Sequence, residues 1–370
     1  MKQLSNRISE TKYALDRLIT RQKVAKKYNL SLEQILDLSI GDNLFIPPDL
    51  IQNIIIKEIQ SIDPREQYPI DYFSLIEEIA RFVGVETSTV YPGLTHNQLI
   101  QRIVRVVAKP ENAISLIVPD KDIYYQFAKN QQLNIVTTDL TSNYELDVNC
   151  ILEQIKKEDS KALVFSSPHY PTANQFKEED VLTLAKETEI PVIIDESYVE
   201  FGKYSLVNQV QSFNNLTIVR SFSKAWGLGA FSSAFLVSNV KNIEALKENY
   251  IIEEIPPIHL LATNYILQAP YRFVELINIF IAERKRVIEH LRMLKGLKVH
   301  RSDTNFLLIQ FTEDVKELFE QLCSKGIIIQ TFENYPAFKD SNKSFLVTLG
   351  DADINDKIIM AIVEILESIL

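Results

Sequence analysis

The sequence is poor in glycine and cysteine and has no long apolar run. Only 9 of its 370 residues are glycine, well under the ~7% typical of proteins, so several should stand where a side chain is not tolerated. Cys150 and Cys323 lie far apart without neighbouring histidine pairs, which excludes a disulfide framework and a recognisable zinc pattern. No apolar stretch approaches the ~18 residues of a membrane-spanning helix, and the N-terminus leads into a charged stretch. We therefore expect a soluble protein of the cytoplasm without a membrane partner.

The charge balance excludes another class of partner. The chain carries a net charge of −10 at pH 7, whereas a nucleic-acid-binding surface needs a basic stripe that displaces counterions from phosphates. Nucleic acid is therefore not an expected partner. The length and the apolar content of 46% are enough for one large domain and a smaller one.

The middle of the chain alternates short β-branched runs with helical patterns. Such apolar runs are typical of strands buried on both faces, and the helical spacers favour a largely parallel sheet. This pattern predicts an α/β fold, with strands at residues 115–118, 134–136, 162–165, 191–194, 216–219 and 234–237.

After a helical stretch from about Ala262 to Leu294, the pattern becomes mixed. Strands are predicted at 306–309 and 327–329, and an amphipathic helix is predicted at 354–369. This part of the sequence indicates a smaller α+β domain.

Polar residues follow three of the predicted strands. Ligands of open α/β sheets bind beyond the carboxyl ends of the strands, so these residues are candidates for a site. Asp195 and Tyr198 follow the strand at 191–194 and place a carboxylate and a phenol where both can point at one ligand. A proline-bounded turn at 166–172 follows another strand and should form a wall of the same site.

The strand at 216–219 is followed by Ser221, Ser223 and Lys224. Their two hydroxyl groups flank an amine nucleophile, and the glycines just after Lys224 allow close approach of the backbone. These residues are suited to cradle a phosphate beside a reactive amine.

Taken in this order, the segments resemble the fold-type I enzymes of the class I and II aminotransferases, most of all histidinol-phosphate aminotransferases and threonine-phosphate decarboxylases. Further stretches extend the resemblance over nearly the whole chain: Leu38–Asn43, Tyr68-Pro69, Pro92–His96, Ser302–Phe306 and Val347–Gly350. The resemblance implies a large pyridoxal-5'-phosphate-binding domain at 46–265, a small domain at 266–370 and an N-terminal segment, 1–45, that joins the small domain.

The resemblance also implies roles for the reactive side chains. Lys224 would bind pyridoxal 5'-phosphate covalently as a Schiff base and move a proton at the substrate carbon. Asp195 would pair with the ring nitrogen of the cofactor, and Tyr198 would donate a hydrogen bond to the ring oxygen. The cofactor phosphate would be bound by Ser221, Ser223 and the backbone amides of Leu94 and Thr95 at the start of a helix.

Other positions are assigned by the same resemblance. Tyr124 is expected to stack on the cofactor ring, although Ile123 fits the same spacing. Gly41 and Asn305 match positions that contact the substrate. Tyr68 matches a tyrosine that reaches the phosphate of a neighbouring subunit, so the resemblance implies a homodimer.

Three positions depart from the family pattern. Ser232 stands eight residues after Lys224, where the family has an arginine that binds the phosphate. Tyr170 replaces an asparagine beside the ring oxygen, and Leu346 replaces the arginine that binds the substrate carboxylate. An unpaired carboxylate against leucine is unfavourable by several kcal/mol, so a standard amino acid is not expected to bind in the standard pose.

The leading interpretation is a pyridoxal-phosphate-dependent aminotransferase that acts on a small-molecule amine or an amino-acid-derived substrate. The losses at Leu346 and Tyr170 leave open a different reaction on the same cofactor, such as decarboxylation, elimination or oxidation. A third alternative is a non-catalytic binding protein with the aminotransferase fold. The presence of Lys224, Asp195 and Tyr198 together favours catalysis.

Overall fold

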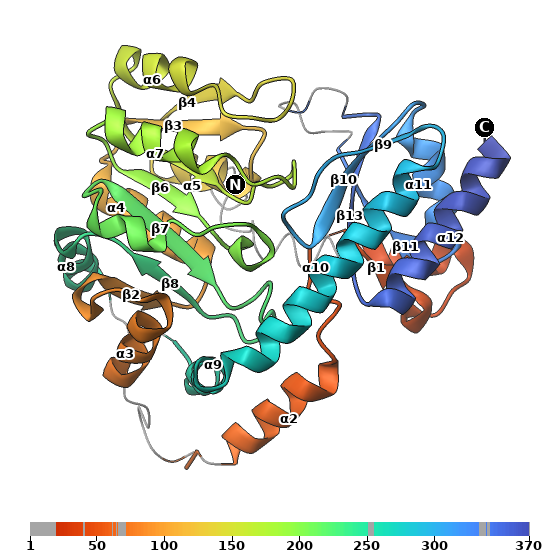
Figure 1. Ribbon diagram of the computed structural model, residues 1–370, viewed down its shortest axis with the longest axis horizontal. Helices are drawn as coiled ribbons and strands as arrows, with labels where there is room; N and C mark the ends of the chain where they lie inside the picture. The colour runs from red at the N-terminus through yellow and green to blue at the C-terminus, as the bar shows by residue number, and fades with distance from the viewer. Residues whose placement is uncertain are drawn as a thin grey trace, which may run out of the picture. The chain divides into compact units, whose positions relative to one another are not determined.

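The computed structural model describes residues 20–39, 41–60, 62–63, 65, 72–250, 255–332, 338 and 341–369 (Figure 1). The chain divides into two compact units. Unit 1 takes the described residues up to Phe45, the short segment Pro171–Ala173 and the described residues from Ile279 onward. Unit 2 takes Ile46–Tyr170 and Asn174–Asn278.

Unit 2 is built on a seven-stranded sheet in the order β2-β8-β7-β6-β5-β3-β4. Every adjacent pair is parallel except the two pairs made by β8, which runs opposite to its neighbours β2 and β7. The prediction of an α/β fold with a mostly parallel sheet is confirmed. The strands are β2 (Val90–Gly93), β3 (Ala113–Val118), β4 (Asn134–Asp139), β5 (Ser160–Ser166), β6 (Val192–Asp195), β7 (Leu216–Ser221) and β8 (Ala234–Val237).

Helices connect these strands and cover the sheet (Figure 1). One group, α4, α5 and α8, packs through a continuous apolar core on strands β3 to β8, and a second pair, α6 and α7, lies together beside β4 and β5. The helices of this unit are α2 (Pro48–Ile59), α3 (Tyr72–Val83), α4 (His96–Val107), α5 (Asp122–Asn130), α6 (Val148–Lys157), α7 (Glu178–Glu187), α8 (Val240–Asn249) and α9 (Pro257–Gln268), with 3-10 turns η3 (Thr87–Thr89), η4 (Val199–Phe201) and η5 (Val207–Gln211).

The helical stretch expected from Ala262 to Leu294 is two helices rather than one. The helix α9 ends at Gln268, and α10 (Pro270–Arg292) begins two residues later. Ala269 adopts φ −138° and ψ 51°, because the ring of the following proline disfavours helical backbone at the residue before it.

Unit 1 is a smaller α+β unit, as expected. Its four-stranded antiparallel sheet has the order β12-β13-β10-β9, and a separate parallel pair joins β1 to β11. Its strands are β1 (Leu36–Asp37), β9 (Leu297–Val299), β10 (Phe306–Phe311), β11 (Ile327–Ile328), β12 (Gln330–Thr331) and β13 (Ser344–Thr348), and its helices are η2 (Leu32–Gln34), α11 (Val315–Ser324), α12 (Ala352–Ile369) and the second half of α10. Within the described ranges, no helix is both long and apolar enough to cross a membrane.

A buried acid follows directly after the end of β6. Glu196 is 1% exposed and accepts hydrogen bonds from the Leu206 amide at 2.7 Å and the Ser205 hydroxyl at 2.5 Å. Burial raises the pKa of Glu196 to about 7, because the charge of Arg220 and the two hydrogen bonds compensate the loss of solvation only in part.

This raised pKa predicts that unit 2 loses stability as the pH rises. Between pH 4.5 and 7 the folded chain holds a proton on Glu196 that the unfolded chain has released, so the free energy of unfolding falls by about 3 kcal/mol across that range. Glu196→Gln should remove this loss. The measurement is urea denaturation at pH 5 and pH 8, followed by the fluorescence of the single tryptophan, Trp226, which lies in unit 2. An unchanged pH dependence in the variant would show that Glu196 does not carry the effect.

Two glycines with the same backbone conformation allow a matched test of steric crowding. Gly326 has φ +78° and an added Cβ would lie 2.5 Å from the backbone oxygen of Gln34, whereas at Gly84, with φ +72°, the nearest atom would be 3.7 Å away. Gly84→Ala should cost about 1–2 kcal/mol for the left-handed backbone alone. Gly326→Ala should cost at least about 1 kcal/mol more, because the β1-β11 region must shift. Denaturation followed by circular dichroism measures both variants, and equal losses would contradict the crowding argument.

Candidate active site

The candidate site lies at the carboxyl ends of three neighbouring parallel strands in unit 2. Asp195, the last residue of β6, is in register with Ser166 at the end of β5 and with Val219 near the end of β7. The residues that the sequence singled out after these strands therefore meet at one edge of the sheet, where open α/β folds bind their ligands.

Asp195 is fully buried and accepts four hydrogen bonds. Its Oδ1 accepts from the Ser197 amide at 2.9 Å and from the Ser197 hydroxyl at 2.6 Å. Its Oδ2 accepts from the Tyr124 hydroxyl at 2.6 Å and from Nζ of Lys121 at 2.5 Å. His96 stands further away, with Nε2 4.0 Å from the same oxygen.

These neighbours fix the charges of the site. Burial by itself raises the pKa of a carboxyl group, but the ammonium of Lys121 and the hydrogen bonds from Lys121 and Ser197 outweigh it and hold the pKa of Asp195 well below its usual value. Burial lowers the pKa of His96 to about 3 despite the opposing charge of Asp195. At neutral pH, Asp195 is therefore ionised and His96 is uncharged.

Lys224 and Tyr198 lie together at the same edge. The Nζ atom of Lys224 is 5.7 Å from the centroid of the Tyr198 ring, which is 3% exposed. Gly227, three residues after Lys224, has φ +77°, and a Cβ there would lie 3.3 Å from the side chains of Ile46 and Ile51. Glycine thus allows the segment after Lys224 to turn back against α2.

Three serine hydroxyls form a chain beside Lys224. The Ser221 hydroxyl donates to that of Ser223 at 3.0 Å, which donates to that of Ser232 at 3.3 Å. The Ser232 hydroxyl donates in turn to the Gly229 carbonyl at 3.0 Å. Position 232, where the family pattern has arginine, therefore contacts the predicted phosphate-binding serines.

The start of α4 has the geometry of a capped helix N-terminus. The Thr95 hydroxyl accepts a hydrogen bond from the Gln98 amide at 3.1 Å, and the Leu94 amide donates to the Gln98 side chain at 3.3 Å. A helix N-terminus favours an anion through its amide groups and its dipole.

Neither Arg220 nor His96 offers an uncommitted cation to this region. The guanidinium of Arg220 donates to Glu200 at 2.7 Å, and the indole of Trp226 donates to the same carboxylate oxygen at 2.9 Å. Arg220 is nearly buried and lies against the rings of Phe82 and Phe235. His96 is uncharged at neutral pH. Neither residue therefore supplies the positive charge that the family pattern has as arginine at position 232.

Two further predicted site residues have identifiable contacts in unit 2. The Tyr124 ring is 1% exposed and packs against Phe127, so its hydroxyl rather than its ring face meets Asp195. The half-buried Tyr170 donates its amide to the Ser166 hydroxyl at 3.1 Å in the turn after β5.

The predicted substrate-contact residues lie in unit 1. Asn305 donates its amide nitrogen to the carbonyls of Gly41 at 3.1 Å and Asp42 at 2.8 Å, and the Gly41 amide donates to the Thr348 hydroxyl at 2.7 Å. Leu346 is fully buried in β13. Tyr68 lies outside the described residues.

The sequence reasoning missed Lys121. It stands three residues after β3, at the same edge of the sheet as Asp195, and immediately precedes α5. The strand-end rule that singled out Asp195 and Lys224 could have found it, because Val118 is followed by the polar pair Asp120 and Lys121.

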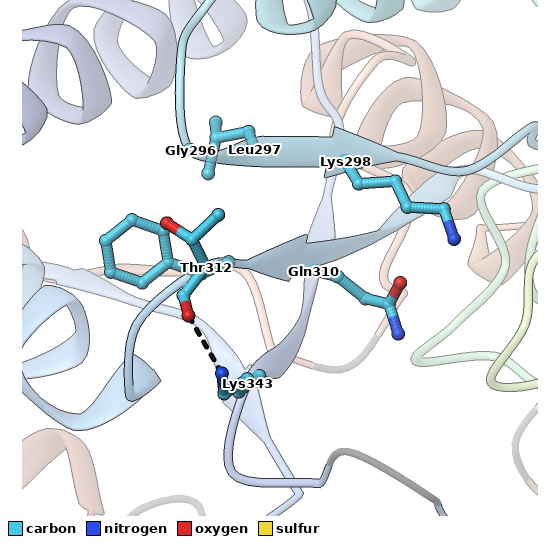
Figure 2. Close-up of a pocket in the computed structure, with 7 residues that line it drawn as sticks. Gly296, Leu297, Lys298, Gln310, Thr312 and Lys343 are labelled. Carbon is cyan, nitrogen blue, oxygen red and sulfur yellow. Dashed lines mark hydrogen bonds between the residues drawn. The ribbon is translucent and has the colours of Figure 1, made fainter.

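A separate pocket of about 320 Å³ lies in unit 1 (Figure 2). Lys298 and Gln310 extend from adjacent strands on one side of it, and Lys343 donates to the Thr312 carbonyl at 2.9 Å. Its lining, residues 296–298, 310–312 and 343, includes no carboxylate and none of the predicted site residues. The candidate active site is therefore the strand-end cluster of unit 2.

Comparison with known proteins agrees with this geometry. The sequence model of the family described as aminotransferase class I and II matches residues 33–362. A histidinol-phosphate aminotransferase of Thermoanaerobacter sp. (strain X514) is 27% identical over 325 residues, which cover 87% of this chain and 90% of the relative.

Solved structures share the fold. The histidinol-phosphate aminotransferase of Sinorhizobium meliloti in complex with pyridoxal-5'-phosphate has a TM-score of 0.82 at 17% identity, covering 94% of this chain and 95% of that chain. The L-threonine-O-3-phosphate decarboxylase of Porphyromonas gingivalis has a TM-score of 0.77 at 17% identity, covering 90% and 100%. The chain therefore belongs to the class I and II aminotransferases, a family of enzymes that use pyridoxal 5'-phosphate.

Proposed function

We propose that the chain transfers amino groups from an amine or amino-acid-derived substrate and that Lys224 is the residue that binds the cofactor covalently. The observation that carries this assignment is the meeting of the Lys224 amine, the Asp195 carboxylate and the serine hydroxyls at one sheet edge. In this proposal unit 2 is the cofactor-binding domain and unit 1 the small domain. The enzyme would work in the cytoplasm.

The donor set of unit 2 is chemically matched to pyridoxal 5'-phosphate. Lys224 offers an amine for the aldehyde, Asp195 a buried carboxylate for the ring nitrogen, and Tyr198 a phenol for the ring oxygen. Ser221, Ser223 and the amides at the start of α4 offer donors for the phosphate. When bound, the cofactor draws electrons from the bond that breaks at the substrate carbon next to nitrogen.

The chain's own groups would supply the proton transfers and the orientation. Nζ of Lys224 would take the proton from the substrate carbon and deliver it to C4' of the cofactor. Lys121 donates to Asp195 and Ser197, so in this proposal it belongs to the surroundings of the carboxylate, and Lys224 beside the serine hydroxyls is the nucleophile. The ionised Asp195 would hold a positive ring nitrogen in place.

The phosphate would be held without the arginine of the family pattern. Hydroxyl and amide donors replace a charge-assisted contact at Ser232, which should weaken phosphate binding by about 1.5–3 kcal/mol. The covalent link to Lys224 would then supply more of the retention of the cofactor than in relatives that keep the arginine.

The predicted substrate-contact residues of unit 1 favour a hydrogen-bond donor over a carboxylate. Leu346 offers an apolar, fully buried side chain where the family pattern has a cation. Among the described residues, the buried Oδ1 of Asn305 accepts no hydrogen bond, and an acceptor of this kind is matched by an N–H or O–H group. We therefore propose a substrate whose recognised end is an amine or hydroxyl rather than an α-carboxylate.

Removing Lys224 tests the assignment. Wild-type protein incubated with pyridoxal phosphate should develop a visible absorbance band that Lys224→Ala lacks, because the covalent link needs this amine. The exposed Lys247→Ala on α8 is the matched control and should keep the band. Amines and amino acids are then screened for a change of the band, and amines without a carboxylate should act best. A band of equal strength in Lys224→Ala would contradict the role of this lysine.

We propose that the enzyme is a homodimer, and exposed apolar side chains of unit 2 support this. Ile56 and Ile59 on α2 and Phe73 on α3 project into solvent, Phe73 with 79% of its surface exposed. Both helices contact α9, so they lie in one part of unit 2. Isolated large apolar residues are common on proteins, but a group of them indicates an interface.

Charging this region should separate the subunits. Sedimentation equilibrium at micromolar concentration should give a dimer for the wild type and a monomer for Ile56→Glu/Ile59→Glu, because burying two carboxylates in an apolar interface is unfavourable. Met360→Glu, at a methionine on α12 that is 70% exposed, is the control and should remain dimeric. A monomeric wild type would refute the dimer.

A further inference from the structure

A second lysine stands against the carboxylate of the candidate site. Nζ of Lys121 donates to Asp195 at 2.5 Å and to the Ser197 hydroxyl at 3.1 Å. It also lies 5.3 Å from the centroid of the Tyr198 ring, and Nζ of Lys224 lies 5.7 Å from the same centroid. Two primary amines therefore face one aromatic ring, but only Lys121 is hydrogen-bonded to Asp195.

The hydrogen bonds to Asp195 leave no place for another donor. A carboxylate accepts roughly four hydrogen bonds. Ser197 supplies two of them through its amide and hydroxyl, and Tyr124 and Lys121 supply the other two. A ring N–H group that binds Asp195 must displace one of these donors.

Among the four donors, the Lys121 ammonium is the one that can leave at the smallest cost. The Ser197 amide belongs to the backbone, and the Tyr124 hydroxyl sits on a ring that is 1% exposed and packed on Phe127. The side chain of Lys121 is 12% exposed, and Lys121 is the residue immediately before α5. Its long flexible stem lets the ammonium move to water without a change of the backbone.

We propose that Lys121 is an internal competitor of the cofactor, whose ring nitrogen binds Asp195 only after the Lys121 ammonium has left it. This inference rests on the proposed function, in which Asp195 receives the ring nitrogen. Lys121 is thus a positioning residue that lowers the affinity for the cofactor and stabilises the cofactor-free protein.

Lys121 is expected to stabilise the cofactor-free protein because of the charges around Asp195. In the cofactor-free protein, Lys121 compensates the buried carboxylate, since Tyr124 and Ser197 are uncharged donors and burial keeps His96 uncharged, with a pKa of about 3. Without Lys121, the carboxylate would lose its hydrogen-bonded cation, and the donors that remain on it, from Tyr124 and Ser197, are uncharged. Bound cofactor would restore the compensation with its ring nitrogen.

The test compares cofactor affinity with the stability of the cofactor-free protein. Lys121→Met keeps the length of the side chain and removes its charge. The dissociation constant for pyridoxal phosphate, measured by absorbance titration and by equilibrium dialysis, should fall at least tenfold. The melting temperature of the cofactor-free variant should fall as well, so the two effects have opposite signs, whereas a merely structural role would weaken both properties.

Further variants keep the test decisive. Lys121→Gln retains a neutral donor and should give intermediate values if the methionine variant folds poorly. Lys121→Met should change the dissociation constant little in an Asp195→Asn background, because the competition is for the Asp195 carboxylate. Lys129→Met, at an exposed lysine of the same helix, should change neither property.

The outcomes separate this inference from the proposed function. A lysine-dependent band in the wild type together with an unchanged or higher dissociation constant in Lys121→Met and Lys121→Gln overturns the competition alone. Absence of a Lys224-dependent band in the wild type and in both Lys121 variants overturns the proposed function and the competition with it. A band that appears only when Lys121 is replaced supports both.

Discussion

Burying the carboxylate of Asp195 at the end of β6 is costly unless its charge is compensated, and the residues around it are arranged to do this. Lys121 and Tyr124 donate to it from the start of α5 and Ser197 from the turn after β6, so the carboxylate links the start of α5 to the end of β6. An isolated charge in such a position would be unfavourable by several kcal/mol. The local fold of unit 2 and the electrostatics of the site therefore depend on the same carboxylate.

A second buried ion pair stands behind the site. Arg220 and Glu200, with the indole of Trp226, link β7 to the turn after β6 and to the segment after Lys224. This arrangement fixes the position of the Lys224 segment but also commits the charge of Arg220. In the region proposed to bind the phosphate, Ser221, Ser223 and Ser232 form a chain of hydroxyl groups, and Arg220 adds no uncommitted charge to it.

In the proposed assignment, the enzyme keeps the amine and carboxylate of its family, at Lys224 and Asp195, and differs in the groups around them. Family membership and the relatives' aminotransferase activity do not favour the alternatives of another reaction class or of a non-catalytic protein. In the same assignment, the altered positions Ser232, Tyr170 and Leu346 would affect how the cofactor and substrate are held rather than which bond is broken. Divergence in such a site is expected to change specificity and affinity before it changes the chemistry.

The sequence by itself determined the α/β architecture and brought Asp195, Lys224 and the serines to one sheet edge, because continuous apolar runs specify buried parallel strands and the carboxyl ends of such strands coincide. The break between α9 and α10 also has a local cause in the sequence, the pair Ala269-Pro270, although only the structure located the break. What tertiary structure alone decided were the partners of each side chain. No sequence pattern places Lys121 or the Tyr124 hydroxyl on Asp195, or Glu200 on Arg220, because these contacts join segments 20 to 74 residues apart. These contacts form only because of the order of the strands in the sheet and the direction in which each side chain points.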